Sequence, residues 1–209
     1  MTLYPKIEAF CKELEQEFDL IPPERKEKLL LIGDYISSKF QENETPKLIV
    51  ICTHNSRRSH IGQLWSAIGA EYFQRPEIHT FSGGTEATAF NIRAVMAFQK
   101  IGFDITTEEE HKSNPIYNIS WKEGMEAYPT FSKKYEDEPN PREGFAAIMV
   151  CSQADEGCPF VFGCDFRLSL PYDDPKEFDG TGMEVEKYDE RVRQIGREIL
   201  FSLSQVNRK

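Results

Sequence analysis

A cysteine and an arginine lie six residues apart in the segment Val50-Ile-Cys-Thr-His-Asn-Ser-Arg-Arg-Ser59. Cys52 ends an apolar run, and Arg58 directly precedes Ser59. A thiolate is a strong nucleophile, and a guanidinium group can hold two oxygens of a tetrahedral anion. The spacing therefore predicts that Cys52 attacks a tetrahedral oxyanion that Arg58 binds.

The residues between this cysteine and this arginine form a short polar loop. Such a loop, placed between a strand and a helix, can direct its backbone N–H groups at one anion, and the helix N-terminus adds partial positive charge. We expect Asn55 and Ser59 to hold the loop and to stabilise the Cys52 thiolate by hydrogen bonding. The alternative is that Cys52 is a small buried residue at the end of a core strand. The predicted substrate-binding residues are Thr53, His54, Asn55, Ser56, Arg57 and Ser59.

Strands and helices must alternate along the chain to position this loop. Residues 48–52 form a continuous apolar run, which is typical of a strand buried on both faces of a parallel sheet. Apolar residues at helical spacing follow in 61–72. The pattern predicts an α/β fold with an open, mostly parallel four-stranded sheet and helices on both faces. The other predicted strands are 78–81, 145–150 and 168–170, and the other helices of this part are 92–102, with Gly102 as its cap, and 188–203.

Two regions lie outside this alternating pattern. Residues 1–45 carry two sets of apolar residues at helical spacing, separated by Pro22-Pro23, and we expect a helical extension packed on the core or against a second subunit in a homodimer. The main domain is then 46–209. Within it, residues 106–142 are predicted to form an irregular insertion. Its aromatic residues either cover the site as a lid or anchor the insertion to the core; they are Tyr117, Trp121, Tyr128, Phe131 and Tyr135.

The composition limits the classes of partner. Among 209 residues, 25 are Lys or Arg and 35 are Asp or Glu, so the net charge of -10 argues against nucleic acid or an anionic membrane as partner. We find neither a signal peptide nor an apolar run long enough to span a bilayer. The five cysteines are odd in number and widely spaced, which favours reduced thiols and a cytoplasmic protein.

The segment from Cys52 to Ser59 resembles the Cys-(five residues)-Arg-Ser signature of the low-molecular-weight protein tyrosine phosphatase superfamily. The resemblance covers roughly residues 47–103 and 145–203. It implies the low-molecular-weight phosphatase fold, with Ser82 bracing Asn55. Asp174, followed by Pro175, matches the Asp-Pro that supplies the general acid in these enzymes. The resemblance therefore implies that Asp174 protonates the leaving oxygen.

The thioredoxin-coupled arsenate reductases share this signature, and a second cysteine segment is similar to theirs. Cys151 and Cys158 are seven residues apart after the third strand, as in the redox segment of those reductases. The resemblance implies that Cys151 attacks the adduct on Cys52, which releases arsenite and leaves a disulfide. Cys158 then attacks Cys151 and carries the disulfide to thioredoxin or another external thiol. It implies a small oxyanion substrate and no bound cofactor.

The chain also departs from this family pattern. His54 stands where the loop usually has Gly, and Arg57 where the reductases usually have Cys. Gln63 stands where some reductases carry a Glu near potassium, so we predict no such ion. We expect no zinc site, because the chain has no close cysteine pair and no paired histidine motif.

Two other functions remain open at this stage. Hydrolysis of phosphate monoesters is one, although Lys176, Glu177 and Phe178 replace the paired tyrosines that usually follow the Asp-Pro of the tyrosine phosphatases. A non-catalytic protein that binds an oxyanion or arsenite is the other. Cys164 is an alternative candidate for the second thiol.

Overall fold

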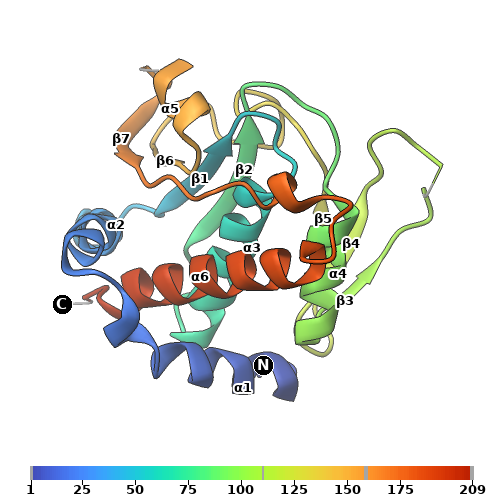
Figure 1. Ribbon diagram of the computed structural model, residues 1–209. Helices are drawn as coiled ribbons and strands as arrows, with labels where there is room; N and C mark the ends of the chain where they lie inside the picture. Colours follow the sequence, from blue (N-terminus) through green and yellow to red (C-terminus); the bar gives the residue numbers. More distant parts are fainter. Residues whose placement is uncertain (1, 110, 158–159, 208–209) are drawn as a thin grey trace.

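A four-stranded parallel sheet forms the centre of the computed structural model, which describes residues 2–109, 111–157 and 160–207 (Figure 1). The strand order is β2-β1-β6-β7, and each neighbouring pair is parallel. The predicted sheet is thus confirmed, although its last strand begins before the predicted residue 168. The strands are β1 (Lys47–Cys52), β2 (His79–Gly84), β6 (Phe145–Met149) and β7 (Cys164–Ser169).

Helices connect these strands and cover the sheet. Helix α3 joins β1 to β2, and α5 joins β6 to β7, so the two connections run in opposite directions along the sheet. Because such connections are right-handed, they place α3 and α5 on opposite faces. The helices are α1 (Pro5–Glu15), α2 (Pro23–Gln41), α3 (Arg58–Tyr72), α4 (Ile92–Ile101), α5 (Ser152–Gly157) and α6 (Glu184–Ser204), with short 3₁₀ turns η1 (Phe18–Leu20) and η2 (Pro175–Phe178).

The strand order places a crevice between the carboxyl ends of β1 and β6. The chain leaves these adjacent strands in opposite directions, and ligands bind at such a switch point in open α/β sheets. Ile51 pairs with Met149, so Cys52 and Cys151 both lie at this edge of the sheet. Apolar side chains are buried along both strands, on both faces of the sheet.

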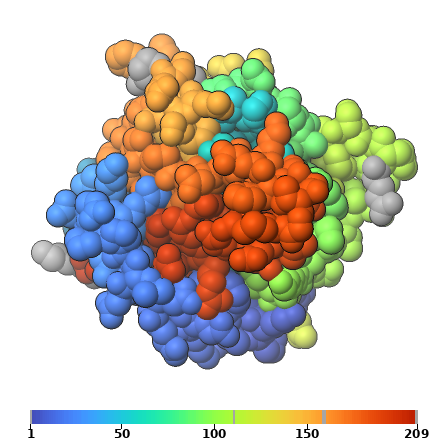
Figure 2. All heavy atoms as spheres, in the orientation of Figure 1, coloured from blue at the N-terminus to red at the C-terminus, as the bar shows by residue number. Residues whose placement is uncertain are grey.

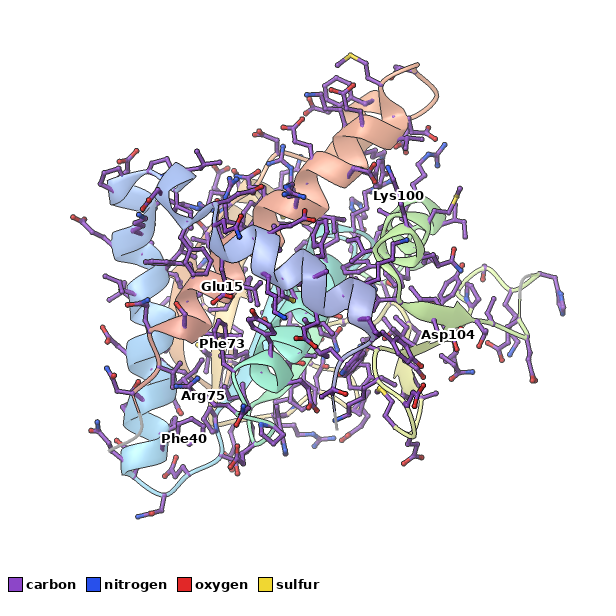
Figure 3. The ribbon with its side chains drawn as sticks, turned by 90° about the horizontal axis from the view of Figure 1, so that it is seen from below. Glu15, Phe40, Phe73, Arg75, Lys100 and Asp104 are labelled. Atoms are coloured by element: carbon purple, nitrogen blue, oxygen red, sulfur yellow. The ribbon has the colours of Figure 1, made fainter. Side chains whose placement is uncertain are left out.

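The N-terminal helices pack within their own chain against α6. Ile7 and Leu14 of α1 and Leu29 and Ile36 of α2 are fully buried. Figure 3 shows α1 crossing α3 and α6. At the end of α1, Glu15 accepts a hydrogen bond of 2.5 Å from the Tyr72 hydroxyl. The division of the chain near residue 45 stays a prediction.

The predicted irregular insertion contributes two strands, β4 and β5, to a small antiparallel sheet whose first strand, β3, ends where the insertion begins, so that prediction is wrong in part. Its strands of three or four residues are too short to show an alternating pattern in the sequence. Trp121 is buried and packs on Tyr128, whose hydroxyl donates to Thr80 O at 2.7 Å. These two aromatic residues therefore anchor the insertion. The strands are β3 (Asp104–Thr106), β4 (Tyr117–Ser120) and β5 (Tyr128–Thr130).

Residues Ser152–Gly157, between Cys151 and Cys158, form helix α5. Ala154 is buried beneath it, and the Asp155 carboxylate accepts hydrogen bonds of 2.6 Å from both Arg167 and Ser169 of β7. These contacts with β7, a later strand, hold α5 in place, and the sequence of α5 itself does not show them. No helix in the described ranges combines the length and apolar character needed to cross a membrane.

Candidate active site

Residues 53–57 form the loop that leads from β1 into α3, and we call it the anion loop. Its carbonyl groups face the segment 85–91, which donates to them. In a peptide group the N–H points opposite to the C=O, so the N–H groups of the loop point away from the segment 85–91. Within the described chain, no N–H of residues 53–59 donates to a protein acceptor. The amide groups of the loop are therefore available to an acceptor from outside the chain. The donors are Thr85 N to Cys52 O (3.1 Å), Glu86 N to Thr53 O (2.8 Å) and Asn91 N to Ser56 O (2.9 Å).

A buried chain of hydrogen bonds fixes this loop beneath the cysteine. Asn55 adopts the left-handed conformation, with φ of 42°, and His54 does not. The Asn55 side-chain amide donates to Ser59 Oγ at 2.9 Å, and Ser59 Oγ lies 3.0 Å from Cys52 Sγ. Asn55 and Ser59 are fully buried. The structure thus brings Cys52, Asn55 and Ser59 together as the sequence predicts.

Ser82 does not brace Asn55, contrary to the expectation from the resemblance. Its hydroxyl lies 3.2 Å from Nδ1 of His60, and its carbonyl accepts from Asn140. The backbone N–H of Lys133 bonds Asn55 Oδ1 instead, at 2.8 Å. Burial, and then the charge of Lys133, lower the pKa of His60 well below its usual value. His60 is therefore a neutral partner for Ser82.

Arg58 and Asp174 meet beside a cleft of about 600 Å³ at this edge of the sheet. Arg58 donates to Tyr172 O at 2.8 Å and to Asp174 Oδ2 at 2.6 Å. Asp174 directly precedes η2 and caps it, since its other carboxylate oxygen accepts from Lys176 N at 3.1 Å. His54 and Cys151 also line the cleft. Figure 2 shows the cyan surface of the anion loop region beside the orange surface of α5 and the segment that follows β7.

Arg57 lies outside this cleft, although the sequence predicts that it binds substrate. Its Nε donates to the Tyr188 hydroxyl at 2.8 Å, and it forms an ion pair of 3.6 Å with Asp179. Burial raises the pKa of Tyr188 to about 12, so its hydroxyl keeps the proton that it donates to Asp179. The Arg57 side chain therefore ties the anion loop to α6, and its Nε also lies 4.0 Å from Asp174 Oδ1, the carboxylate that Arg58 binds.

Cys151 is the second thiol at the anion loop. Its Sγ lies 3.3 Å from Thr53 Oγ1 and accepts from Ala154 N at 3.4 Å, and the residue is buried. Cys158 lies outside the described residues. Cys164 begins β7 at the opposite edge of the sheet, where it pairs with Phe145. A six-residue strand spans about 20 Å, so Cys164 is not placed to act on Cys52 in this structure.

Several groups at the site give no signal in the sequence. The carbonyl of Tyr172 holds Arg58, and Gln153 of α5 lines the cleft, but neither residue type indicates such a role. Lys133 supports Asn55 through its backbone, which any residue could do. Groups of three or more His, Cys, Asp or Glu side chains able to hold a metal ion are absent from the described residues.

The curated proteins that the chain resembles in sequence include several bacterial arsenate reductases. No protein-family model matches the chain. The chain is 29% identical over 150 residues to an arsenate reductase of Halalkalibacterium halodurans, across 71% of this chain and 88% of the relative. It is 25% identical over 159 residues to an arsenate reductase of Bacillus subtilis, across 75% and 94%.

Among solved structures, a low-molecular-weight phosphotyrosine phosphatase from Vibrio cholerae has a TM-score of 0.48 at 13% identity, across 76% of this chain and 94% of that one. By sequence, the chain is similar to bacterial arsenate reductases.

Proposed function

We propose that this protein is an arsenate reductase that uses Cys52 as nucleophile and Cys151 as the second thiol. The observation that carries the proposal is the position of Cys151 at the anion loop, with its Sγ 3.3 Å from Thr53 Oγ1. A phosphatase hydrolyses its cysteinyl-phosphate with water and needs no second thiol. A reductase must supply two electrons, and two thiols that form a disulfide supply them.

The first step is attack of the Cys52 thiolate on arsenic. The amide groups of the anion loop and the Arg58 guanidinium bind the oxygens of arsenate, and Ser59 Oγ, 3.0 Å from Cys52 Sγ, stabilises the thiolate. One arsenic–oxygen bond breaks as the sulfur–arsenic bond forms. Asp174 protonates the leaving oxygen, which departs as water or hydroxide.

Reduction follows at the same edge of the sheet. The Cys151 thiolate attacks Cys52 Sγ, the sulfur–arsenic bond breaks, and its electron pair stays on arsenic, which leaves as arsenite. The Cys52–Cys151 disulfide is then attacked by Cys158, whose role rests on the resemblance. A protein dithiol such as thioredoxin reduces the resulting Cys151–Cys158 disulfide, and we place this cycle in the reducing cytoplasm.

Ester hydrolysis is the second candidate, because the anion loop, Arg58 and Asp174 suit a phosphate ester equally. The walls of the cleft favour a small inorganic anion. Lys176 and Glu177 line it where an aryl ester needs an apolar surface, and Tyr172 is buried. We therefore expect weak hydrolysis of aryl phosphates beside arsenate reduction.

Turnover of arsenate with thioredoxin, measured beside hydrolysis of p-nitrophenyl phosphate, tests the proposal. Cys151→Ser and Cys158→Ser should each abolish multiple-turnover reduction and spare any hydrolysis at Cys52. Cys164→Ser is the matched control, since Cys164 lies at the other edge of the sheet, and it should keep wild-type rates. Mass spectrometry should find a Cys151–Cys158 disulfide in the wild type after arsenate turnover.

Two results would contradict this function. Hydrolysis without arsenate turnover, with thioredoxin or a small dithiol as donor, would make the protein a phosphatase. Saturable arsenate binding without either reaction would make it a binding protein. If Cys151→Ser and Cys158→Ser both reduce arsenate at the wild-type rate, the proposed transfer of the disulfide between these cysteines is wrong.

A further inference from the structure

We infer that Arg25 of the N-terminal helix α2 is a positioning residue for the active site, acting through Tyr172 on Arg58 and Asp174. This inference rests on the proposed function for its activity measurement. The guanidinium carbon of Arg25 lies 4.5 Å from the centre of the Tyr172 ring. The carbonyl of the same Tyr172 accepts the 2.8 Å hydrogen bond of Arg58. One residue thus contacts both the extension and the anion clamp.

The contact between Arg25 and Tyr172 is buried and charged. Arg25 Nε donates to Glu198 Oε2 of α6 at 2.7 Å, and the Glu198 side chain is 2% exposed. Burial, and then the nearby Glu198 carboxylate, raise the pKa of the Tyr172 phenol well above its usual value. A planar guanidinium can stack on a ring while it donates in its own plane to a carboxylate. Arg25 therefore fixes the Tyr172 ring against α6.

The backbone of Tyr172 connects the residue to both sides of the active site. Its N–H bonds Val150 O at 3.2 Å, beside Cys151. Two residues later, Asp174 accepts the bond from Arg58 and caps η2. A rotation of the Tyr172 backbone would move the acceptor of Arg58 and the carboxylate of Asp174 together.

Helix α6 holds the same segment through a second side chain. Arg191 donates to Asp173 Oδ2 at 3.3 Å, and Gln194, which Arg191 also contacts, bonds Glu198. Asp173 is almost fully exposed, so its ion pair with Arg191 contributes little. The buried contact of Arg25 is the stronger restraint.

The test compares two arginines that each lie over an aromatic ring and bond a glutamate, although Arg193 is the more exposed of the two. Arg193 of α6 also lies over an aromatic ring, that of Phe10 at 5.0 Å, and bonds Glu17 of the extension at 2.8 Å, but it does not contact the Tyr172 segment. Arg193→Met is therefore the matched control for Arg25→Met. The double variant Arg25→Met/Glu198→Met replaces the buried ion pair as a unit, which often leaves stability unchanged. It keeps the test valid where Arg25→Met alone does not fold.

Two readouts separate positioning from simple attachment of the helix. Loss of Arg25 should lower kcat for arsenate at least about tenfold, because catalysis is sensitive to small displacements, while KM changes less than about threefold. Hydrogen exchange of the backbone at residues 172–177 should accelerate in the Arg25 variants and not in Arg193→Met. Arg25→Lys keeps the charge without the planar stack and should recover part of the rate.

Exchange does not depend on turnover. If the wild type fails to reduce arsenate, the proposed function fails, and exchange alone decides this inference. If the Arg25 variants match Arg193→Met in exchange at 172–177, or in kcat where arsenate is reduced, Arg25 only attaches α2 to α6 and the inference is wrong.

Discussion

The guanidinium of Arg58 donates to Asp174 Oδ2 at 2.6 Å, so the proposed anion clamp and the proposed general acid bond each other directly. Both side chains are largely buried, at 11% and 24% exposure. An oxyanion that binds Arg58 competes with the Asp174 carboxylate for the same donors. Substrate binding should therefore displace Asp174 from Arg58 and free it to take up the proton that it later donates.

Replacement of Asp174 by Asn should separate binding from catalysis. The anionic competitor of Arg58 is removed, so arsenate or phosphate should protect Cys52 from alkylation at a severalfold lower concentration. Turnover should fall by roughly 10²–10⁴-fold, because the acid is lost. The measurements are the protection curve and kcat for arsenate. Unchanged turnover would move the acid role to another residue, such as Asp173.

Ser59→Ala should slow alkylation of Cys52 at neutral pH. The Ser59 hydroxyl lies 3.0 Å from Cys52 Sγ, and hydrogen bonds to charged groups contribute about 1.5–3 kcal/mol, so the loss should be about tenfold or more. Ser66→Ala is a matched control, because its hydroxyl is also buried in α3 but bonds the Gly62 carbonyl. Equal alkylation rates in the wild type and Ser59→Ala would show that the hydroxyl does not stabilise the thiolate.

The buried ammonium group of Lys133 should lower the free energy of unfolding by an amount that depends on pH. Burial lowers the pKa of its ammonium group from 10.5 to about 8. Below pH 8 both folded and unfolded chains are protonated, and the folded state bears the full cost of the buried charge. That cost is about 3.5 kcal/mol, from the difference between 10.5 and 8 at about 1.4 kcal/mol for each pH unit. Between pH 8 and 10.5 the unfolded chain binds more protons, so stability rises with pH.

Lys133→Met should therefore raise the free energy of unfolding at pH 7, and the gain should disappear as the pH approaches 10.5. The backbone bond to Asn55 remains in this variant. Urea unfolding at pH 7 and pH 10 measures the difference from wild type, and exposed Lys134→Met is the control. A gain that is equal at both pH values would contradict the assigned titration.

The sequence predicts the elements whose signals are local. The continuous apolar run of β1 and the Cys52-to-Ser59 spacing each lie within a few residues, and the structure places Cys52 at the end of β1 and Arg58 at the start of α3. Contacts between distant segments leave no such signal. Arg25 reaches Tyr172, and Lys133 replaces Ser82 as the support of Asn55, through packing that no spacing in the chain expresses.

Gly84, the last residue of β2, lies in close contact with the anion loop. A Cβ atom at this position would lie 2.2 Å from Glu86 O and 2.6 Å from both Asn55 N and Thr53 O, all of them backbone atoms that cannot move aside cheaply. Gly84→Ala should therefore push the loop out of shape and weaken protection of Cys52 by phosphate at least about tenfold, because misplaced donors bind anions poorly. Gly182→Ala, where a Cβ meets no atom within 4 Å, should leave protection unchanged. Circular dichroism would confirm that both variants fold. If Gly84→Ala binds phosphate as the wild type does, the anion loop does not depend on this close contact, and the rigidity that we assign to it is wrong.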